Sequence, residues 1–171
     1  MRQAIDKVAA TNSRVLITGP SGSGKELAAR MIHASSNRAG GPFVVLNAAT
    51  ITPDSMETEL FGIDALGPVP QRIGALEEAH GGTLFLDEIA DMPKETQGKI
   101  LRVLVDQSFQ RVNGSVKVEV DVRIVSSTAR DLDSEVRTGR FREDLLHRLA
   151  VVPLRVPALA ERREDIPDLV S

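Results

Sequence analysis

The 171-residue sequence contains no cysteine, tyrosine or tryptophan, and only five phenylalanines. The lack of cysteine excludes disulfides and thiolate metal sites, which fits a reducing compartment such as the cytoplasm. Few aromatic rings are available for base stacking, and a net charge of −3 gives no general attraction to nucleic acid. No apolar run is long enough to span a membrane. Direct contact of this chain with DNA or a membrane is therefore not expected.

The composition that remains is typical of a globular domain, with 42% hydrophobic and 26% charged residues. The length is sufficient for one domain with a proper core. Residues 1–8 have a helical pattern without a preceding cap, and residues 162–171 begin a further helical pattern. We therefore expect residues 1–171 to be one domain of a longer protein.

The most informative stretch is a glycine-rich turn between an apolar run, Val15 to Thr18, and a helical pattern, Lys25 to His33. The turn reads Gly19-Pro20-Ser21-Gly22-Ser23-Gly24-Lys25. This is the arrangement of a phosphate-binding loop, in which glycines let backbone N–H groups approach an anion. The lysine and the N-terminus of the helix add positive charge. The stretch predicts that the chain binds a nucleoside triphosphate.

The residue after the lysine is Glu26, where such loops usually carry a serine or threonine that holds Mg²⁺. A carboxylate here either serves the metal ion, directly or through water, or favours the first helical turn electrostatically. The residues alone do not decide between the two. In the helix that follows, the spacing places Leu27, Met31 and Ile32 on one face.

A second nucleotide signature is the apolar run Thr83 to Leu86, which ends in two acids, Asp87 and Glu88. Asp87 is predicted to hold Mg²⁺, directly or through water. Glu88 is predicted to polarise the attacking water as a general base. Together with the phosphate-binding loop, this acidic pair indicates hydrolysis of the nucleotide as well as binding.

Polar residues also follow two other predicted strands. Asn47 ends the run Phe43 to Leu46, at a place where open α/β sheets carry functional groups, or it forms only a turn. Ser126-Ser127-Thr128 ends a strand that begins near Val120. These hydroxyls either sense a γ-phosphate or form a helix cap before Asp131.

Residues 137–149 are rich in arginine. A solvated face is the ordinary interpretation of such a run. The alternative is that Arg142 and Arg148 reach the triphosphate of a neighbouring subunit.

Local patterns predict the surroundings of the sheet. Asn113-Gly114 between two apolar runs indicates a β-hairpin. Asp54 is a plausible cap for a helix that ends at Phe61, and the glycines and prolines of residues 62–70 exclude regular structure there. The core stripe of the helix after Pro93 is predicted to be Ile100, Leu101, Leu104 and Val105.

With these motifs in place, the chain resembles the central ATPase domain of bacterial enhancer-binding proteins, the AAA+ activators of sigma-54 RNA polymerase. The similar segments are residues 19–26, 59–62, 81–89, 139–149 and 162–166. The resemblance implies an α/β P-loop NTPase fold, a three-layer sandwich with a five-stranded parallel central sheet and an inserted β-hairpin. It implies that residues 1–171 form the large nucleotide-binding subdomain, without the helical lid, the receiver domain and the DNA-binding domain.

The resemblance also implies the residues that hold the cofactors. ATP or ADP is expected to contact residues 19–27, Asp87 and Thr128, with Thr128 at the position of the first sensor. The Mg²⁺ ion is expected at Asp87, with Glu26 as the second candidate ligand.

Four residues are implied to be catalytic. Asp87 and Glu88 resemble the Walker B pair, in which Glu88 is the catalytic residue, and Asn47 resembles the switch that restrains Glu88 until a ligand is sensed. Arg142 and Arg148 resemble two arginine fingers that act on the neighbouring subunit.

Two departures from the family pattern concern function. Residues 63–70 replace the loop Gly-Ala-Phe-Thr-Gly-Ala that contacts the sigma factor, so contact with sigma-54 RNA polymerase is doubtful. Ala129 stands where an asparagine usually lies beside the first sensor. A chain without the sigma-contacting loop resembles the NtrX-type nitrogen response regulators of alphaproteobacteria.

The expected function is that of an ATP-binding and ATP-hydrolysing central domain of a cytoplasmic two-component response regulator that controls nitrogen metabolism. Such a domain self-associates, and its hydrolysis requires oligomerisation and the lid. Promoter DNA and the sensor kinase are reached through domains outside this chain. The alternative is a nucleotide-binding oligomerisation module with little turnover and no remodelling of sigma-54.

Overall fold

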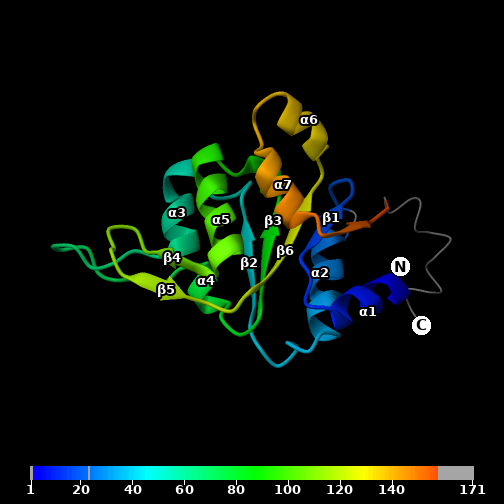
Figure 1. Ribbon diagram of the computed structural model, residues 1–171, viewed down its shortest axis with the longest axis horizontal. Helices are drawn as coiled ribbons and strands as arrows, with labels where there is room; N and C mark the ends of the chain where they lie inside the picture. The colour runs from blue at the N-terminus through cyan, green and yellow to red at the C-terminus, as the bar shows by residue number, and fades with distance from the viewer. Residues whose placement is uncertain (1, 23, 158–171) are drawn as a thin grey trace.

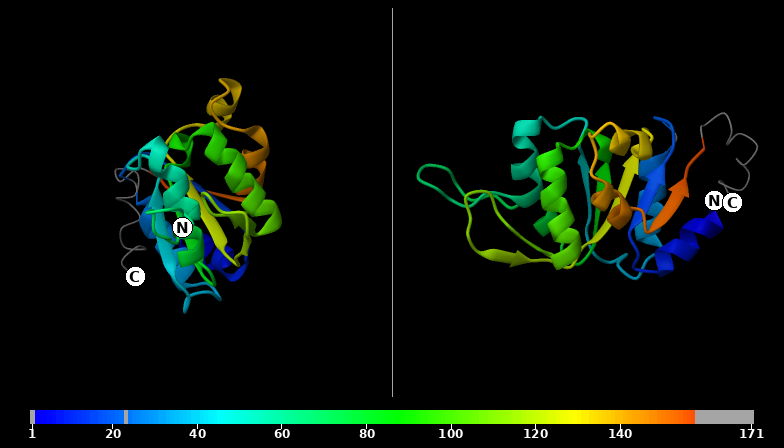
Figure 2. Two further views of the ribbon diagram at one scale, coloured as in Figure 1. Left: turned by 90° about the vertical axis from the view of Figure 1, so that its left-hand side faces the viewer. Right: turned by 45° about the horizontal axis from the view of Figure 1, so that its top comes forward.

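The computed structural model describes residues 2–22 and 24–157, and it shows a central β-sheet with helices on both faces (Figures 1 and 2). The five strands are parallel and follow the order β2-β3-β6-β1-β7. Their bounds are β1 Val15–Thr18, β2 Phe43–Asn47, β3 Thr83–Asp87, β6 Arg123–Thr128 and β7 Val152–Arg155. The expected three-layer α/β fold with a five-stranded parallel sheet is confirmed. The predicted motif at 162–166 lies outside the described residues.

Two separate cores cover the sheet, one on each face. In β3, Leu84 and Leu86 belong to the larger core, and Phe85 belongs to the smaller one. The helices over the larger core are α3 Pro53–Phe61, α4 Ala75–Glu78, α5 Lys94–Asp106, α6 Leu132–Arg137 and α7 Glu143–Leu149. The smaller core lies beneath α1 Arg2–Ala10 and α2 Lys25–Ala34. Burial on both faces explains why the central strands are continuous apolar runs in the sequence.

Parallel pairing brings the carboxyl ends of neighbouring strands to one edge of the sheet. Asn47 at the end of β2 lies beside Asp87 at the end of β3. At the other side of β6, Thr128 lies beside Thr18, the last residue before the glycine-rich turn. We call this line of strand ends the carboxyl edge.

The strand β7 tolerates a proline because it lies at the margin of the sheet. Pro153 pairs in register with Leu16 of β1, and its other side has no strand partner among the described residues. An edge strand can lose one N–H donor without leaving a buried carbonyl unpaired. The pairing with β1 therefore continues through the proline.

A two-stranded hairpin, β4 Ser108–Gln110 and β5 Lys117–Glu119, projects from the sheet as expected (Figure 1). Beside it extends a second projection, residues 63–73, which we call the arm. No helix or strand of regular length forms in the arm, as its glycines and prolines predict. Isolated bridges nevertheless join Ile63 to Arg72 and Leu66 to Val69, so the arm is a narrow ladder rather than an irregular loop.

The predicted cap of α3 is wrong by two residues. The helix begins at Pro53, and the N-cap is Thr52 in an extended conformation. Proline is favoured at the first helical position because its φ is already helical and the N–H it lacks has no partner there. Asp54 therefore lies inside the first turn, where its charge favours the helix dipole.

Two predicted helix faces are also corrected. Leu27 is 57% exposed, whereas Ile32 is buried as predicted, together with Ala28. In α5, Ile100 and Leu104 are buried as predicted, but Val105 is 52% exposed and Val103 is buried.

None of the helices in the described part of the chain has the length and apolar character needed to cross a membrane.

Candidate nucleotide-binding site

The glycine-rich turn has the backbone of a phosphate-binding loop. Gly22 and Gly24 have φ angles of 77° and 91°, a region that favours glycine. Gly24 is the N-cap of α2, so the first N–H groups of that helix face the loop. The buried Lys25 donates from Nζ to the carbonyl oxygens of Gly19 at 2.8 Å and Pro20 at 3.0 Å. The lysine ammonium group therefore lies against the backbone of the loop, and a Cβ at Gly22 would meet no atom within 4 Å. Ser23 lies outside the described residues.

The acid at the end of β3 is held by both neighbouring strands. Asn47 of β2 donates from Nδ2 to Asp87 Oδ2 at 3.3 Å. Ser127 of β6 donates from Oγ to Asp87 Oδ1 at 2.5 Å. Both contacts fix the orientation of the carboxylate, and a carboxylate is a ligand that Mg²⁺ uses in proteins. The position and orientation of Asp87 thus suit the predicted role.

The next residue, Glu88, turns back toward the phosphate-binding loop. Its φ of 53° is in the left-handed region, a strained conformation for a residue that is not glycine. The carboxylate lies between two groups, with Oε1 3.9 Å from Lys25 Nζ and Oε2 accepting from the Ala129 N–H at 3.4 Å. The Glu88 N–H donates to Ser127 Oγ at 3.3 Å. The strained turn aims the acid at the space beside the loop.

The structure does not pair Asn47 with Glu88, as the switch expectation required. The side chain of Asn47 contacts Asp87 and accepts from the Ala49 N–H at 2.9 Å. The reason is the strand register, which sets Asn47 directly beside Asp87, while Glu88 has already turned away. Asn47 lies at the site, and in this conformation it orients the metal-binding acid.

Among the three hydroxyls of β6, the one that contacts the acids is Ser127 rather than Thr128. The Thr128 hydroxyl accepts from the Arg130 N–H at 3.0 Å and is fully buried. The alternative of a helix cap is wrong for Thr128, since Asp131 caps α6 by accepting from the Asp133 N–H, and its role as a sensor stays a prediction. Side chains alternate along a strand, so Ser127 and Thr128 face opposite sides. That alternation, combined with the register against β3, is the signal that could have found Ser127.

Glu26 does not join Asp87. Its carboxylate accepts from Arg30 Nε at 3.1 Å, one helical turn along α2, and both side chains are about half exposed. This ion pair accounts for the carboxylate without a metal ion, and the charge lies in the first turn of the helix, where it is favourable. Leu27, the last residue of the predicted nucleotide contact, is exposed to solvent.

The two arginines lie away from the loop and the acids. Arg142 is the N-cap of α7, and its guanidinium holds Asp144 in a bidentate pair at 3.0 and 2.9 Å. This pair raises the pKa of Arg142 and lowers the pKa of Asp144, chiefly through the hydrogen bonds between them. Arg148 lies in the last turn of α7 and is exposed. Neither arginine bonds to Lys25, Asp87 or Glu88 within the described residues, so a role in the site requires a second subunit.

A cleft of about 940 Å³ opens beside the phosphate-binding loop. Its walls include Gly19 and Pro20 of the loop, Thr128 at the end of β6, His147 of α7, and one residue that the motifs do not cover, Arg155. This volume is in the range of small-molecule sites. Arg155 ends β7 in register with Thr18, which explains its place at the cleft. Its only sequence signal was a basic residue at a strand end.

The comparisons with known proteins place this site in a family. The model of the sigma-54 interaction domain matches residues 1–155, and the chain belongs to that family. It is 68% identical to the nitrogen assimilation regulatory protein NtrX of Azorhizobium caulinodans, an alignment that covers 100% of this chain and 38% of that protein.

Two solved structures of NtrX from Brucella abortus, one in complex with ADP and one with ATP, are 67% identical over 99% of this chain. Their TM-scores are 0.91 and 0.90, and the chain covers 37% and 39% of them. The chain therefore spans about two fifths of the length of these relatives. The family expected from the motifs is confirmed, as is the likeness to the NtrX type.

Proposed function

We propose that this chain binds ATP–Mg²⁺ at the carboxyl edge and hydrolyses ATP as the central domain of a nitrogen response regulator. The observation that carries the proposal is the convergence of Lys25 and Glu88, 3.9 Å apart, on the space beside the glycine-rich loop. The complexes of the NtrX relative with ADP and ATP support it.

The groups at this edge have separate roles in phosphoryl transfer. The loop N–H groups and Lys25 neutralise the phosphates, while Asp87 holds the Mg²⁺ ion, which supplies further charge neutralisation. Glu88 orients the attacking water and accepts its proton. Ser127 and Asn47 fix the orientation of Asp87.

The site is completed by a second copy of the chain. Arg142 and Arg148 of a neighbouring subunit stabilise the charge of the transition state, an effect that is worth roughly 10³–10⁵-fold in rate for arginine fingers. The intact regulator works in the cytoplasm, where further domains receive a signal from a sensor kinase and bind promoter DNA. Because the arm lacks the family's sigma-contacting sequence, we do not assign it the sigma-54 contact.

The variant Glu88→Gln tests this assignment in the intact protein. We expect ATP to bind with unchanged affinity, measured by calorimetry, while turnover falls by about 10²–10⁴-fold, the usual worth of a general base. The matched control is Glu57→Gln, which removes a carboxylate that pairs with Lys99 at 2.6 Å, outside the site.

Specific activity of the wild type should also rise with protein concentration, since the fingers act between subunits. Activity that does not change with concentration would contradict the shared site. Binding without turnover in both the wild type and Glu88→Gln would identify a nucleotide-binding oligomerisation module instead.

A further inference from the structure

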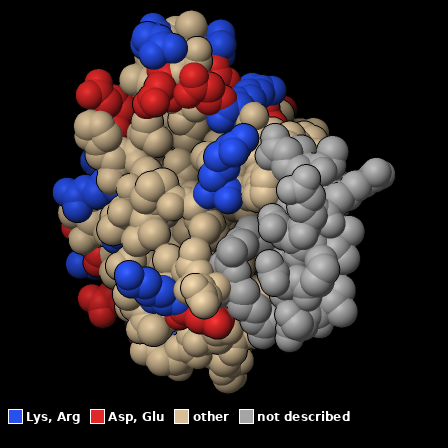
Figure 3. Space-filling model, turned by 90° about the vertical axis from the view of Figure 1, so that its right-hand side faces the viewer, with Lys and Arg blue, Asp and Glu red and all other residues tan. Residues whose placement is uncertain are grey.

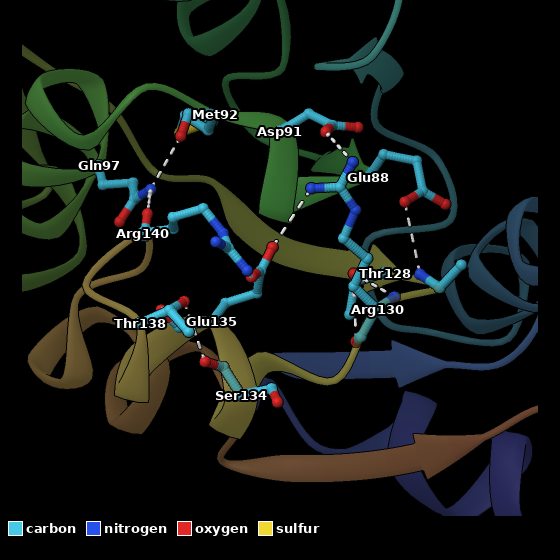
Figure 4. A network of polar contacts seen from close by, with 11 residues as sticks. Glu88, Asp91, Met92, Gln97, Thr128, Arg130, Ser134, Glu135, Thr138 and Arg140 are labelled. Carbon is cyan, nitrogen blue, oxygen red and sulfur yellow. Dashed lines mark hydrogen bonds and ion pairs between the residues drawn. The ribbon is translucent and has the colours of Figure 1, made fainter.

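Beyond the site itself, one carboxylate is enclosed by two arginines. Glu135 of α6 is buried, although glutamate is seldom buried unless it is paired. It accepts from Arg140 Nε at 2.8 Å and Nη2 at 2.5 Å, and from Arg130 Nη1 at 3.2 Å (Figure 4). The hydrogen bonds from Arg140, more than those from Arg130, lower the pKa of Glu135 against the opposing effect of burial. Glu135 is therefore the centre of a charged cluster with Arg130 and Arg140, which we call the hub.

The first arginine connects this hub to the turn that carries Glu88. Arg130 Nη2 lies 2.9 Å from Asp91 Oδ1, in the 3₁₀ helix Ile89–Asp91 that directly follows Glu88. The residue before Arg130 is Ala129, whose N–H donates to the Glu88 carboxylate. The guanidinium of Arg130 and the backbone N–H of its neighbour Ala129 thus both contact the segment that carries Glu88.

The second arginine connects the hub to the segment that carries the proposed finger. Residues 139–142, which we call the finger segment, join α6 to α7 and end at Arg142. Besides the side-chain bonds to Arg140, the Glu135 carbonyl accepts the N–H groups of Arg140 at 2.9 Å and Phe141 at 3.1 Å. One residue therefore holds the finger segment through its side chain and its backbone.

A second bridge runs in parallel through Gln97 of α5, whose side chain is fully buried. Its Nε2 donates to the carbonyls of Met92 at 2.8 Å and Arg140 at 3.1 Å, and its Oε1 accepts from the Arg142 N–H at 2.9 Å. Met92 directly follows the 3₁₀ helix. The two bridges begin and end at the same two segments, as Figure 4 shows.

We propose that Glu135 and Gln97 are positioning residues that couple the turn of Glu88 to the finger segment of the same subunit. This inference rests on the proposed function, because the finger acts on a neighbouring subunit. A shift of the Glu88 turn on binding or hydrolysis of ATP displaces Asp91 and Met92, and both bridges pass that displacement to Arg142. The nucleotide in one site thereby sets the guanidinium that the subunit offers to the next site.

These bonds fix geometry more than they add stability. The side chains of Arg130 and Arg140 are 54% and 64% exposed, and ion pairs with such exposed partners contribute little to stability, whereas their directed bonds hold the segment in one position. Figure 3 shows that acidic and basic side chains gather at the α6 end of the molecule.

The test compares Glu135→Gln and Arg140→Gln with the control Arg137→Gln in the intact protein. Arg137 lies on the same helix, is exposed, and contacts only the Ser134 hydroxyl among the described residues. We expect unchanged ATP affinity and a kcat that falls by about 10²-fold for Glu135→Gln, since a displacement of about 1 Å costs a reaction this much. The kcat of Arg140→Gln, which changes an exposed side chain, should fall less, and the kcat of Arg137→Gln should equal that of the wild type.

Mixing subunits separates positioning from damage to the fold. Glu135→Gln subunits keep an intact site of their own, and Glu88→Gln subunits keep intact fingers. Their mixture should hydrolyse ATP faster than either variant alone, because Glu88→Gln fingers serve the sites of Glu135→Gln subunits. Wild-type turnover by Glu135→Gln, or a loss that mixing does not restore, would overturn the inference.

A measurement without turnover keeps the inference distinct from the proposed function. Addition of ADP should change amide hydrogen exchange at residues 139–145 in the wild type, and this change should be absent in Glu135→Gln. If the wild type hydrolyses no ATP at any concentration, the proposed function fails, and this exchange result alone decides the coupling. An equal change of hydrogen exchange in the wild type and in Glu135→Gln would refute the coupling.

Discussion

The carboxyl edge and the arm are held in place in different ways. At the edge, the ends of β1, β2, β3 and β6 are fixed by strand register, and Asp87 is contacted from both sides by Asn47 and Ser127. The arm extends beyond the sheet and is held at its base, by the backbone bond from the Asp64 N–H to the Val112 carbonyl and by the side chain of Arg111. Strand ends fixed on both sides position chemical groups, whereas an extension held only at its base can change without cost to the site.

The anchor of the arm is an ion pair with two partners. Arg111 contacts Glu77 of α4 at 2.7 Å and Asp64 of the arm at 3.1 Å, and these bonds raise its pKa. Beyond this anchor the tip presents apolar side chains to solvent, with Leu66 59% and Val69 40% exposed. The arm is also the place where the sequence departs from the family's sigma-contacting loop. The two regions therefore divide the chain into a preserved site and a variable extension.

The largest expected effect is the loss of nucleotide binding in Lys25→Ala. The variant removes charge-assisted hydrogen bonds, each worth about 1.5–3 kcal/mol, so the Kd for ATP should rise by about 10²-fold. Isothermal titration calorimetry on the intact protein measures this change. The matched control is Lys99→Ala, a lysine of α5 near the arm side, which should bind ATP like the wild type. An equal loss of ATP affinity in both variants would show that nucleotide binding does not depend specifically on the carboxyl edge.

The same division explains what the sequence could predict. Strand, turn and acid pair were recognisable because each depends on local chemistry: glycine for positive φ, apolar runs for doubly buried strands, and acids at a strand end. Lys25, Asp87 and Glu88 were therefore predicted and are found together at the carboxyl edge. The roles that the resemblance assigns to them stay predictions.

The errors concern partners that only the tertiary structure brings together. Whether Ser127 or Thr128 faces Asp87 depends on the phase of β6 against β3, and the pattern of three hydroxyls does not contain that phase. The pairing of Glu26 with Arg30 was within reach, since the two are four apart on a helix. Gln97 gave no signal at all, because a single glutamine in a helix looks like a surface residue until its burial is known.

A smaller effect is expected at the anchor of the arm. Arg111→Leu leaves two partly buried carboxylates without their shared partner, and it should lower the free energy of unfolding by about 1–2 kcal/mol. Limited proteolysis should cut the arm near Gly67 faster, while ATP affinity stays unchanged. The control is Arg102→Leu, an exposed arginine of α5 without a hydrogen bond or ion pair in the described residues. A weaker affinity for ATP in Arg111→Leu, but not in the control, would show that the arm and the edge are coupled.

The smallest effect depends on pH and compares the two charged hubs. Arg111 is one guanidinium between two carboxylates, whereas Glu135 is one carboxylate between two guanidiniums. The pKa of Glu135 is lowered in the folded protein from an ordinary value of 4.5. Its contribution to stability is therefore complete above about pH 4.5 and is lost as the pH falls through the lower pKa of the folded state.

This sign can be measured as the difference in unfolding free energy between the wild type and Glu135→Gln. The glutamine does not titrate, so the difference should be constant from neutral pH down to about pH 5 and then shrink. Control titrations with Arg137→Gln remove the general effect of acid on the fold. A difference that stays constant through the acid range would mean that Glu135 has the same pKa in the folded and the unfolded protein. The two arginines would then not favour the charged form of Glu135, and the hub would differ from Arg111, whose two carboxylates raise its pKa.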